Sequence, residues 1–248
     1  MPLFSTSLEN QQQAASAGVK TYPALSESSK NFRIVEKFNR ATLNPSGFPA
    51  FYTTGGNGTP VVNTSGNAYG GLLLNTSGVI GDDTAVVSAQ AYPRSALWAG
   101  IDSTSQLEAD FIWDSTSTNI EFFIGLVYNT AGILTALPTT ARHLGIYVDQ
   151  SAGANYMLTS ANGTTQATTD TGVAVAGATL RINIVWSGND SAVIRLFSGT
   201  NLDTLRSTHT VTSLGFTVVN PMFIHFFVQT EATAAKGISL YSWQMQTQ

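Results

Sequence analysis

Residues 107–128, LEADFIWDSTSTNIEFFIGLVY, decide the fold class of this chain of 248 residues. From 107 to 113 every second residue is apolar, and the same alternation resumes from 120 to 128 after a short loop of Ser, Thr and Asn. Two such runs joined by a polar loop predict an antiparallel hairpin. The second run is apolar on its other face too, at Phe123 and Val127, which indicates a central strand of a sandwich covered on both sides.

The chain is poor in charge. Charged residues make up 10% of it, against about 25% in a typical soluble domain. Its apolar fraction of 43% is ordinary and predicts a folded protein. A sparsely charged surface repels its neighbours weakly, which suits a protein packed into an assembly. The net charge of −4 argues against a nucleic-acid binder, because phosphate contacts depend on Lys and Arg.

Three further features narrow the class of protein. Cysteine is absent, which excludes a disulfide framework and any zinc site built on Cys. No apolar run approaches the roughly 18 residues of a membrane span, so we expect no membrane partner. The first residues lack a basic segment followed by an apolar one, so we expect no secretory signal and a product made in a cytoplasm.

Residues 1–30 differ from the remainder of the chain. Residues 6–9, TSLE, fit a capping box, but the apolar face of the segment that follows is too weak to hold a helix alone. We therefore expect an N-terminal arm, extended or briefly helical, that is ordered by contact with another molecule. Residues 31–248 carry about a dozen short alternating runs with turn signals about every 8–12 residues, the pattern of an antiparallel β-sandwich.

Two runs late in the chain make specific predictions. Asn162-Gly163 signals a hairpin, and residues 223–228 are apolar on both faces, as in a central strand. Strict alternation in the last run places Trp243 on the side opposite to Leu240. Earlier, the residues from 180 to 186 alternate cleanly between apolar and polar, with Arg181 and Asn183 as the polar members.

Charge is distributed unevenly along the chain. Basic residues gather between 20 and 40, whereas residues 82–121 carry seven acids against Arg94 alone. Two interpretations stay open: the arm of one subunit lies on the acidic face of a neighbour, or both are independent solvated patches. The predicted assembly interface comprises Lys20, Lys30, Arg33, Phe123 and Val127.

The order of these elements resembles the concanavalin A-like, or laminin G-like, jelly-roll sandwiches of tailed-phage virion proteins. The matching stretches, spread from about 31 to 248, are EKFNR, GDDTAVVS, LEADFIWDSTSTNIEFFIGLVYN, TLRINIVWSGNDSAVIRLFSGT and KGISLYSWQMQ. The resemblance implies an all-β, antiparallel jelly-roll sandwich whose first and last strands pair near each other.

The same resemblance implies a role. It points to a non-enzymatic structural protein of the virion that decorates or cements a phage capsid through its arm and its sandwich interfaces. The implied partners are the major capsid protein and further copies of this chain, in a trimer by analogy. Because lectins and glycoside hydrolases share the fold, two alternatives remain: a lectin-like module of a head or tail fibre that binds glycan or a receptor, and a glycoside hydrolase.

The hydrolase alternative depends on paired carboxylates. Laminarinase-type hydrolases carry a Glu-x-Asp-x-x-Glu strand whose carboxyl groups serve as acid and nucleophile. Glu108 and Asp110 begin such a pattern, but Trp113 occupies the place of the second Glu, and the next acid, Asp114, comes one position too late. We therefore expect no catalytic residue here and interpret these carboxylates as solvated strand residues.

Metal-ligating patterns are weak. His143, His209 and His225 have no spacing typical of a metal site, and His225 within FIHFFV is expected in the core or at an interface. Turn oxygens at 82–83 and 189–190 could ligate Ca²⁺, although turn formation explains these Asp and Asn residues equally well. We expect no cofactor.

Sugar binding would use an aromatic platform with amides and carboxylates nearby. Trp113 and Trp186 fall on the apolar side of their predicted strands, which places them in the core. Trp98 and Tyr92 are the aromatic residues least constrained by the pattern. They are the predicted glycan-binding residues.

Overall fold

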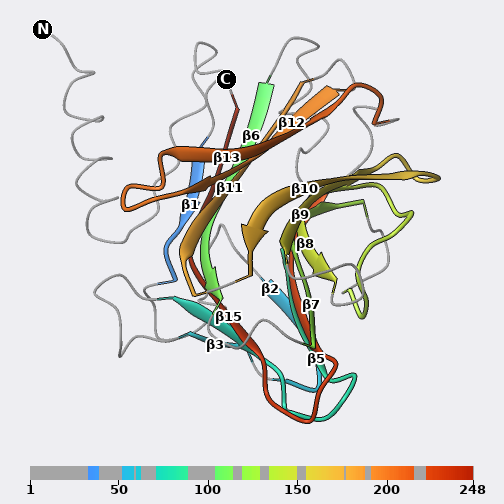
Figure 1. The fold of residues 1–248 in the computed structure, drawn as a ribbon, viewed down its shortest axis with the longest axis vertical. Coiled ribbons are helices and arrows are strands. Elements are labelled where there is room, and N and C mark those ends of the chain that lie inside the picture. Colours follow the sequence, from blue (N-terminus) through green and yellow to red (C-terminus); the bar gives the residue numbers. More distant parts are fainter. Residues whose placement is uncertain are drawn as a thin grey trace, which may run out of the picture.

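The structure, a computed structural model, describes residues 33–38, 52–58, 60–62, 71–88, 104–113, 119–128, 134–149, 155–175, 177–187, 191–214 and 222–247. Within these ranges fifteen strands form two antiparallel sheets packed face to face, so the predicted all-β sandwich is confirmed (Figure 1). No described segment is a helix long and apolar enough to cross a membrane. The predicted N-terminal arm lies outside the described residues.

Sheet A has eight strands in the order β13-β12-β11-β6-β15-β4-β3, with β1 also paired to β15. The bounds are β1 Arg33–Glu36, β3 Val61–Val62, β4 Leu72–Asn75, β6 Thr104–Trp113, β11 Thr179–Ser187, β12 Ser191–Ser198, β13 Thr204–Val211 and β15 Gly237–Thr247. The pairing of β1 with β15, the last strand, confirms the expectation for the two ends of the sandwich.

Sheet B has seven strands in the order β10-β9-β8-β7-β14-β5-β2. Their bounds are β2 Tyr52–Gly56, β5 Asp83–Ser88, β7 Ile120–Val127, β8 His143–Asp149, β9 Asn155–Ala161, β10 Gln166–Ala174 and β14 Phe223–Thr230. The hairpin predicted at Asn162-Gly163 joins β9 to β10 and is confirmed. There the side-chain oxygen of Asn162 accepts hydrogen bonds from the backbone N–H groups of Thr164 and Thr165, at 3.0 and 2.9 Å.

The two sheets enclose one main apolar core. Phe111 of β6 meets Phe122 of β7 across the sandwich, with ring centroids 6.1 Å apart, and Tyr156 of β9 packs edge-on against both rings, at 6.0 and 5.8 Å. All three side chains are fully buried, and each such burial stabilises the fold by about 1.5–3 kcal/mol. The inward-facing apolar residues of the stretch 107–128, Phe111 and Phe122 among them, therefore form the centre of the core.

The hairpin predicted within residues 107–128 is wrong. β6 belongs to sheet A, where it pairs with β11 and β15, whereas β7 belongs to sheet B, where it pairs with β14 and β8. The chain thus crosses between the sheets after β6. Alternation identified both strands correctly but carries no information about their partners, and a short polar loop fits a crossing as well as a hairpin.

The central strands of sheet B are covered on both faces, as predicted for 120–128 and 223–228. On the outer face Phe123, Val127 and Phe227 are fully buried in a second apolar cluster, which also includes Leu134 and Leu137 from the segment before β8. The ring of Phe123 lies over two glycines: a Cβ added at Gly145 would approach it to 2.6 Å. Because Gly125 and Gly145 have no side chains, the ring of Phe123 can pack directly on the backbone at these two positions.

The last strand departs from strict alternation. A register shift between Leu240 and Ser242 makes Tyr241 an extra residue, a β-bulge. Leu240 and Trp243 consequently both face the core, at 0% and 1% exposure. The prediction that they lie on opposite sides is wrong, because a single bulge residue exchanges the two faces of the strand beyond it.

Candidate functional site

The outer face of sheet A carries an ordered set of polar side chains. Alternation along β6 and β11 turns the apolar residues inward, so that Glu108, Asp110, Arg181 and Asn183 lie on the outer face, where Asn183 is buried by its neighbours at 5% exposure. The strand register then sets Arg181 opposite Asp110 and Asn183 opposite Glu108. On the other side of β6, the strand β15 brings up two more polar residues. We call this set the polar cluster: Glu108, Asp110, Arg181, Asn183, Ser242 and Gln244.

Asp110 is held by a bidentate ion pair. The Arg181 guanidinium donates from Nε to Oδ1 at 2.6 Å and from Nη2 to Oδ2 at 3.0 Å. The Ser242 hydroxyl donates to Oδ2 at 3.3 Å. The hydrogen bonding between Arg181 and Asp110 is the main reason why the pKa of Arg181 is raised. Such paired bonds fix the orientation of both planar groups.

Glu108 is surrounded by amide donors. Gln244 donates to Oε1 at 2.7 Å, and Asn183 and Gln106 donate to Oε2 at 3.3 and 3.2 Å. Arg181 Nε lies 3.7 Å from Glu108 Oε1 and so links the two carboxylates. The side chains of Arg181 and Glu108 remain 30% and 18% exposed. A molecule on this face of the sheet can therefore reach them.

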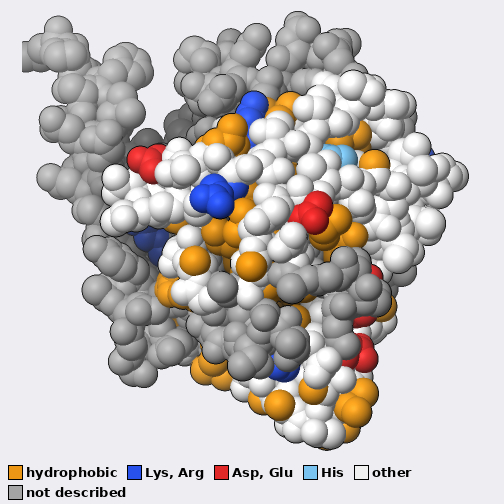
Figure 2. Space-filling model, in the orientation of Figure 1, with side chains coloured by type: hydrophobic (Ala, Val, Ile, Leu, Met, Phe, Trp, Pro, Cys, Tyr) orange, Lys and Arg blue, Asp and Glu red, His pale blue; other side chains and the backbone are white. Residues whose placement is uncertain are grey.

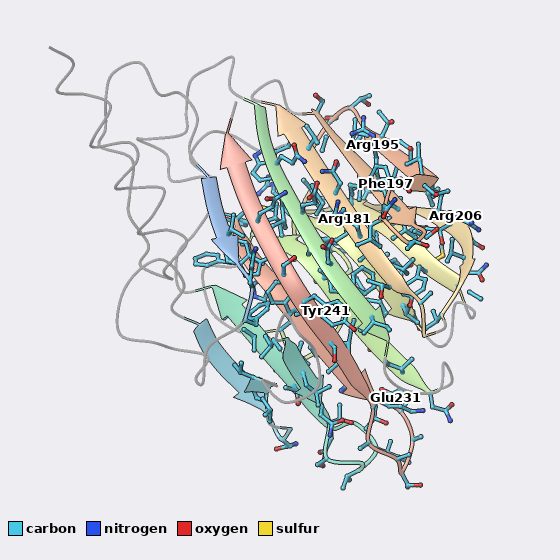
Figure 3. The ribbon with its side chains drawn as sticks, turned by 90° about the vertical axis from the view of Figure 1, so that its left-hand side faces the viewer. Arg181, Arg195, Phe197, Arg206, Glu231 and Tyr241 are labelled. Atoms are coloured by element: carbon cyan, nitrogen blue, oxygen red, sulfur yellow. The ribbon has the colours of Figure 1, made fainter. Side chains whose placement is uncertain are left out.

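The cluster continues onto the next two strands. On β12, Arg195 lies opposite Asn183 and Phe197 lies opposite Arg181, and β13 places Leu205 opposite Phe197. Figure 3, which views sheet A from outside, shows Arg181, Arg195 and Phe197 on these neighbouring strands. An aromatic ring thus adjoins the carboxylates, amides and guanidinium of the polar cluster.

Sequence reasoning found only part of this site. It singled out Glu108 and Asp110, and the structure places both on the outer face, but Asp114 lies outside the described residues. It did not assign Asn183, Arg181 or Gln244 to a site, because these residues are 71 to 136 positions away from their partners. The clean alternation of Arg181 and Asn183 with buried residues was the signal that could have found them.

The other predicted site residues lie elsewhere. Trp98, Tyr92, Lys20 and Lys30 fall outside the described residues. Of Arg33 the structure gives only its backbone pairing with Gln246.

Phe123 and Val127, predicted at an assembly interface, are fully buried in the second apolar cluster of their own chain. That a neighbouring molecule packs on this cluster in an assembly stays a prediction. Trp186 packs against the main core, as predicted.

The three histidines are buried structural residues. His225 is fully buried, with Nδ1 3.2 Å from the carbonyl oxygen of Phe223. His209 lies between the sheets: its Nε2 is 3.0 Å from Ser160 Oγ and its Nδ1 is 2.8 Å from Thr169 Oγ1. In the part of the chain that the structure describes, no group of three or more His, Cys, Asp or Glu is arranged to hold a metal ion.

The predicted turn acids Asp82 and Asp83 are both buried. Asn57 donates a hydrogen bond to Asp82 at 3.0 Å, and the backbone N–H of Gly58 donates to the carbonyl oxygen of Asp83 at 2.9 Å. Burial raises the pKa of Asp83. These contacts fit the turn-forming interpretation, and Asn189–Asp190 lies outside the described residues.

No protein-family model and no curated protein matches the sequence. Solved structures do match it. A protein of unknown function from Shewanella oneidensis MR-1 is 13% identical, with a TM-score of 0.64 over 100% of this chain and 95% of that one. The Ulex europaeus lectin UEA-II, complexed with galactose, is 11% identical, with a TM-score of 0.59 over 88% and 98%. The CBM2 module of the evolved Dit of Lactobacillus casei BL23 phage J-1 is 12% identical, with a TM-score of 0.58 over 87% and 95%.

The protein has the concanavalin A-like fold. At these identities the likeness shows the fold alone. The concanavalin A-like fold agrees with the sandwich that the sequence predicts, and it leaves the choice of function to the side chains on its surfaces.

Proposed function

We propose that this chain is a non-enzymatic glycan-binding module and that the polar cluster on sheet A contacts the sugar. The observation that carries the proposal is the arrangement of two carboxylates, two amides and a guanidinium on one sheet face, beside the ring of Phe197. The Ulex lectin in its galactose complex and the phage CBM2 module, which share the fold, support it. Glycan binding is one of the alternatives that the sequence leaves open beside capsid decoration, and the polar side chains on sheet A favour it.

The chemistry of the cluster suits a sugar. Hydroxyl groups both donate and accept hydrogen bonds, and carboxylates and amides together supply both functions. An aromatic ring offers an apolar surface to the C–H face of a sugar ring. The hydrogen bonds inside the cluster fix its side chains before any ligand arrives, which lowers the entropic cost of binding.

The same contacts favour binding over catalysis. An acid catalyst of glycoside hydrolysis has to carry a proton to the leaving group. Here Asp110 accepts from a guanidinium and Glu108 accepts from three amides. Fixed acceptors of this kind suit a recognition surface.

A glycan array with the purified full-length chain tests the proposal. We expect binding to one class of glycan and at least a tenfold loss of affinity in Glu108→Ala, which removes a carboxylate acceptor for sugar hydroxyl groups, and in Gln244→Ala, which removes the amide that holds this carboxylate at 2.7 Å. Ile80→Ser is the control, since Ile80 is 60% exposed in the turn before β5. Array binding that survives both cluster variants would refute this location of the site.

The capsid-decoration role stays a prediction that a glycan-binding module can also fulfil. The low charge of the chain and the likeness to a module from a phage support a location in the virion, with other virion proteins and further copies of this chain as partners. On the face seen in Figure 2, charged side chains are few among polar and apolar ones. Deleting residues 1–30 should leave a folded sandwich that no longer enters particles, and unchanged incorporation would contradict the role of the arm.

A further inference from the structure

The outer face of β12 and β13 is cationic and aromatic where it adjoins the polar cluster. A register shift opposite Phe197 makes Arg206 an extra residue of β13, beside Leu205. In such a bulge both residues oppose a single residue of the neighbouring strand. Figure 3 shows Arg206 beyond Phe197 on the side of sheet A that faces the viewer. We call this set the arginine patch: Arg195, Phe197, Leu205 and Arg206.

The two arginines of the patch differ from Arg181 in their partners. Arg181 is paired with Asp110 and Glu108, whereas Arg195 and Arg206 form no ion pair with any residue that the structure describes. The two carboxylates of the adjacent polar cluster are already engaged. In a chain with net charge −4, two guanidinium groups that have no carboxylate partner among the described residues favour a ligand that brings negative charge.

The patch is open to a large ligand. Leu205 is 52% exposed, Arg206 is exposed, and Arg195 and Phe197 are half-buried. A guanidinium binds a carboxylate or a phosphate through two parallel hydrogen bonds. Phe197 lies between Arg206 on β13 and Arg181 of the polar cluster, whereas Arg195 directly adjoins Asn183 of the cluster. A saccharide lying along this row could stack on Phe197, place its hydroxyl groups on the cluster and place an anionic group on the arginines.

We propose that the arginine patch binds the anionic group of an acidic saccharide, a carboxylate or a phosphate. The inference rests on the proposed glycan-binding function and specifies the class of glycan. Nucleic acid also carries phosphate, but the net charge of the chain opposes its long-range attraction. The affinities measured for the two in the assay below decide between them.

The test uses the full-length chain and saccharides matched in all but charge. Binding is measured by calorimetry with an oligogalacturonate and with its methyl ester, which keeps the sugar rings and removes the carboxylates. A phosphorylated oligosaccharide and its dephosphorylated form test the phosphate source, and a single-stranded oligodeoxynucleotide tests nucleic acid. We expect one acidic saccharide to bind at least tenfold more tightly than its uncharged partner, with an affinity that falls as salt is added.

Variants then locate the binding. Arg206→Gln alone and the double variant Arg195→Gln/Arg206→Gln should each lose tenfold or more of the affinity for the acidic saccharide and bind its uncharged partner unchanged. Lys37→Gln is the matched control, because it also removes one positive charge from an exposed side chain. Lys37 directly follows β1, and the strands β15, β6 and β11 separate β1 from β12.

Three outcomes would overturn the inference. Equal affinity for each acidic saccharide and its uncharged partner would overturn it while the glycan-binding function stands, and so would arginine variants that bind the acid as the parent does. Tighter binding of the oligodeoxynucleotide would reassign the patch to nucleic acid. Absence of binding to every saccharide, charged or uncharged, would overturn the inference together with the proposed function.

Discussion

The stability of the sandwich should fall on mild acidification because of His143. This side chain is fully buried on the outer face of sheet B, where its ring packs edge-on against Phe123 at 5.8 Å between centroids. Nδ1 donates to the carbonyl oxygen of Ala141 at 2.7 Å, and Nε2 lies 2.9 Å from Thr159 Oγ1. Burial lowers the pKa of His143 from 6.5 to about 4, against a smaller raising effect of the hydrogen bond to Ala141.

The sign and the size of the effect follow from this pKa. The unfolded chain takes up a proton at His143 near pH 6.5, whereas the folded chain does not until about pH 4, so acidification favours the unfolded state. The stabilisation is fully present above pH 6.5 and is lost as the pH falls toward the folded-state pKa. Because one pKa unit corresponds to about 1.4 kcal/mol, the total loss approaches roughly 3 kcal/mol, of which about 2 kcal/mol is lost by pH 5.

Urea denaturation at pH 8 and pH 5 measures the effect against a His143→Gln variant. Other groups titrate in the same range, among them His209, whose pKa burial also lowers, but their contributions cancel when the two proteins are compared. The free energy of unfolding of the parent relative to that of the variant should fall by about 2 kcal/mol between pH 8 and pH 5. If the variant does not fold, an NMR titration of the His143 ring in the parent measures the same pKa directly.

A pH-independent difference between the two proteins would refute the reasoning. So would a ring that titrates near pH 6.5 in the folded protein, because such a ring would have to be solvated. Either result would mean that the segment before β8 leaves this part of sheet B open to water.

Three further predictions concern stability and can be checked by the same denaturation. Arg181→Met should lower the free energy of unfolding by about 1–3 kcal/mol, because it leaves the Asp110 carboxylate without its cation. The double variant with Asp110→Asn should lose less than the sum of the single losses, and additive losses would contradict the pairing. Gly145→Ala should cost roughly 1–3 kcal/mol, because the added Cβ would lie 2.5 Å from the carbonyl oxygen of Ile124 and 2.6 Å from the ring of Phe123, and a neutral effect would show that both the backbone and the ring can shift. Glu121→Gln should stabilise the fold at pH 7 by roughly 0.5 kcal/mol, less at high salt, since burial and then two neighbouring carboxylates raise the pKa of Glu121 and its ionised form is disfavoured; a loss of stability would contradict this.

The sequence predicts the strands and their faces well where burial is on both sides. Residues 120–128 and 223–228 are apolar at nearly every position, and the structure places β7 and β14 side by side at the centre of sheet B. The apolar surplus is explained by the two clusters that cover them. The spacing of apolar residues and the local composition can be read directly from a short stretch of sequence, and they are enough to predict strands that are buried on both faces.

Strand partners and registers are not local properties. The predicted hairpin of β6 and β7 failed although both strands exist, because their pairing is decided by strands far away in sequence, β11 and β14 among them. The face of Trp243 was predicted wrongly for a related reason. The bulge at Tyr241 is one residue long, and nothing in an alternating pattern shows where the pattern shifts.

The candidate site depends on the same long-range pairing. Glu108 and Asp110 are recognisable as outward-facing carboxylates, but what holds them comes from β11 and β15, between 71 and 136 residues further along the chain. Without the strand order, these acids look like solvated strand residues. With it, they are fixed acceptors in a network that spans three strands.

Among the residues that the structure describes, the two outer faces of the sandwich differ in what they offer a polar ligand. At the centre of sheet B the outer side chains of Phe123, Val127 and Phe227 are apolar and pack with Leu134 and Leu137, so a sugar there would have to displace apolar packing and leave its hydroxyl groups unpaired, which costs several kcal/mol. On sheet A the outer side chains at the centre of the sheet already form hydrogen bonds and still present carboxylate and guanidinium groups to solvent. When a hydroxylated ligand reaches this face, its hydroxyl groups give up hydrogen bonds to water and form hydrogen bonds to the polar side chains of sheet A instead. Binding to sheet A is therefore favoured by the same alternation that buries the apolar residues of β6 and β11.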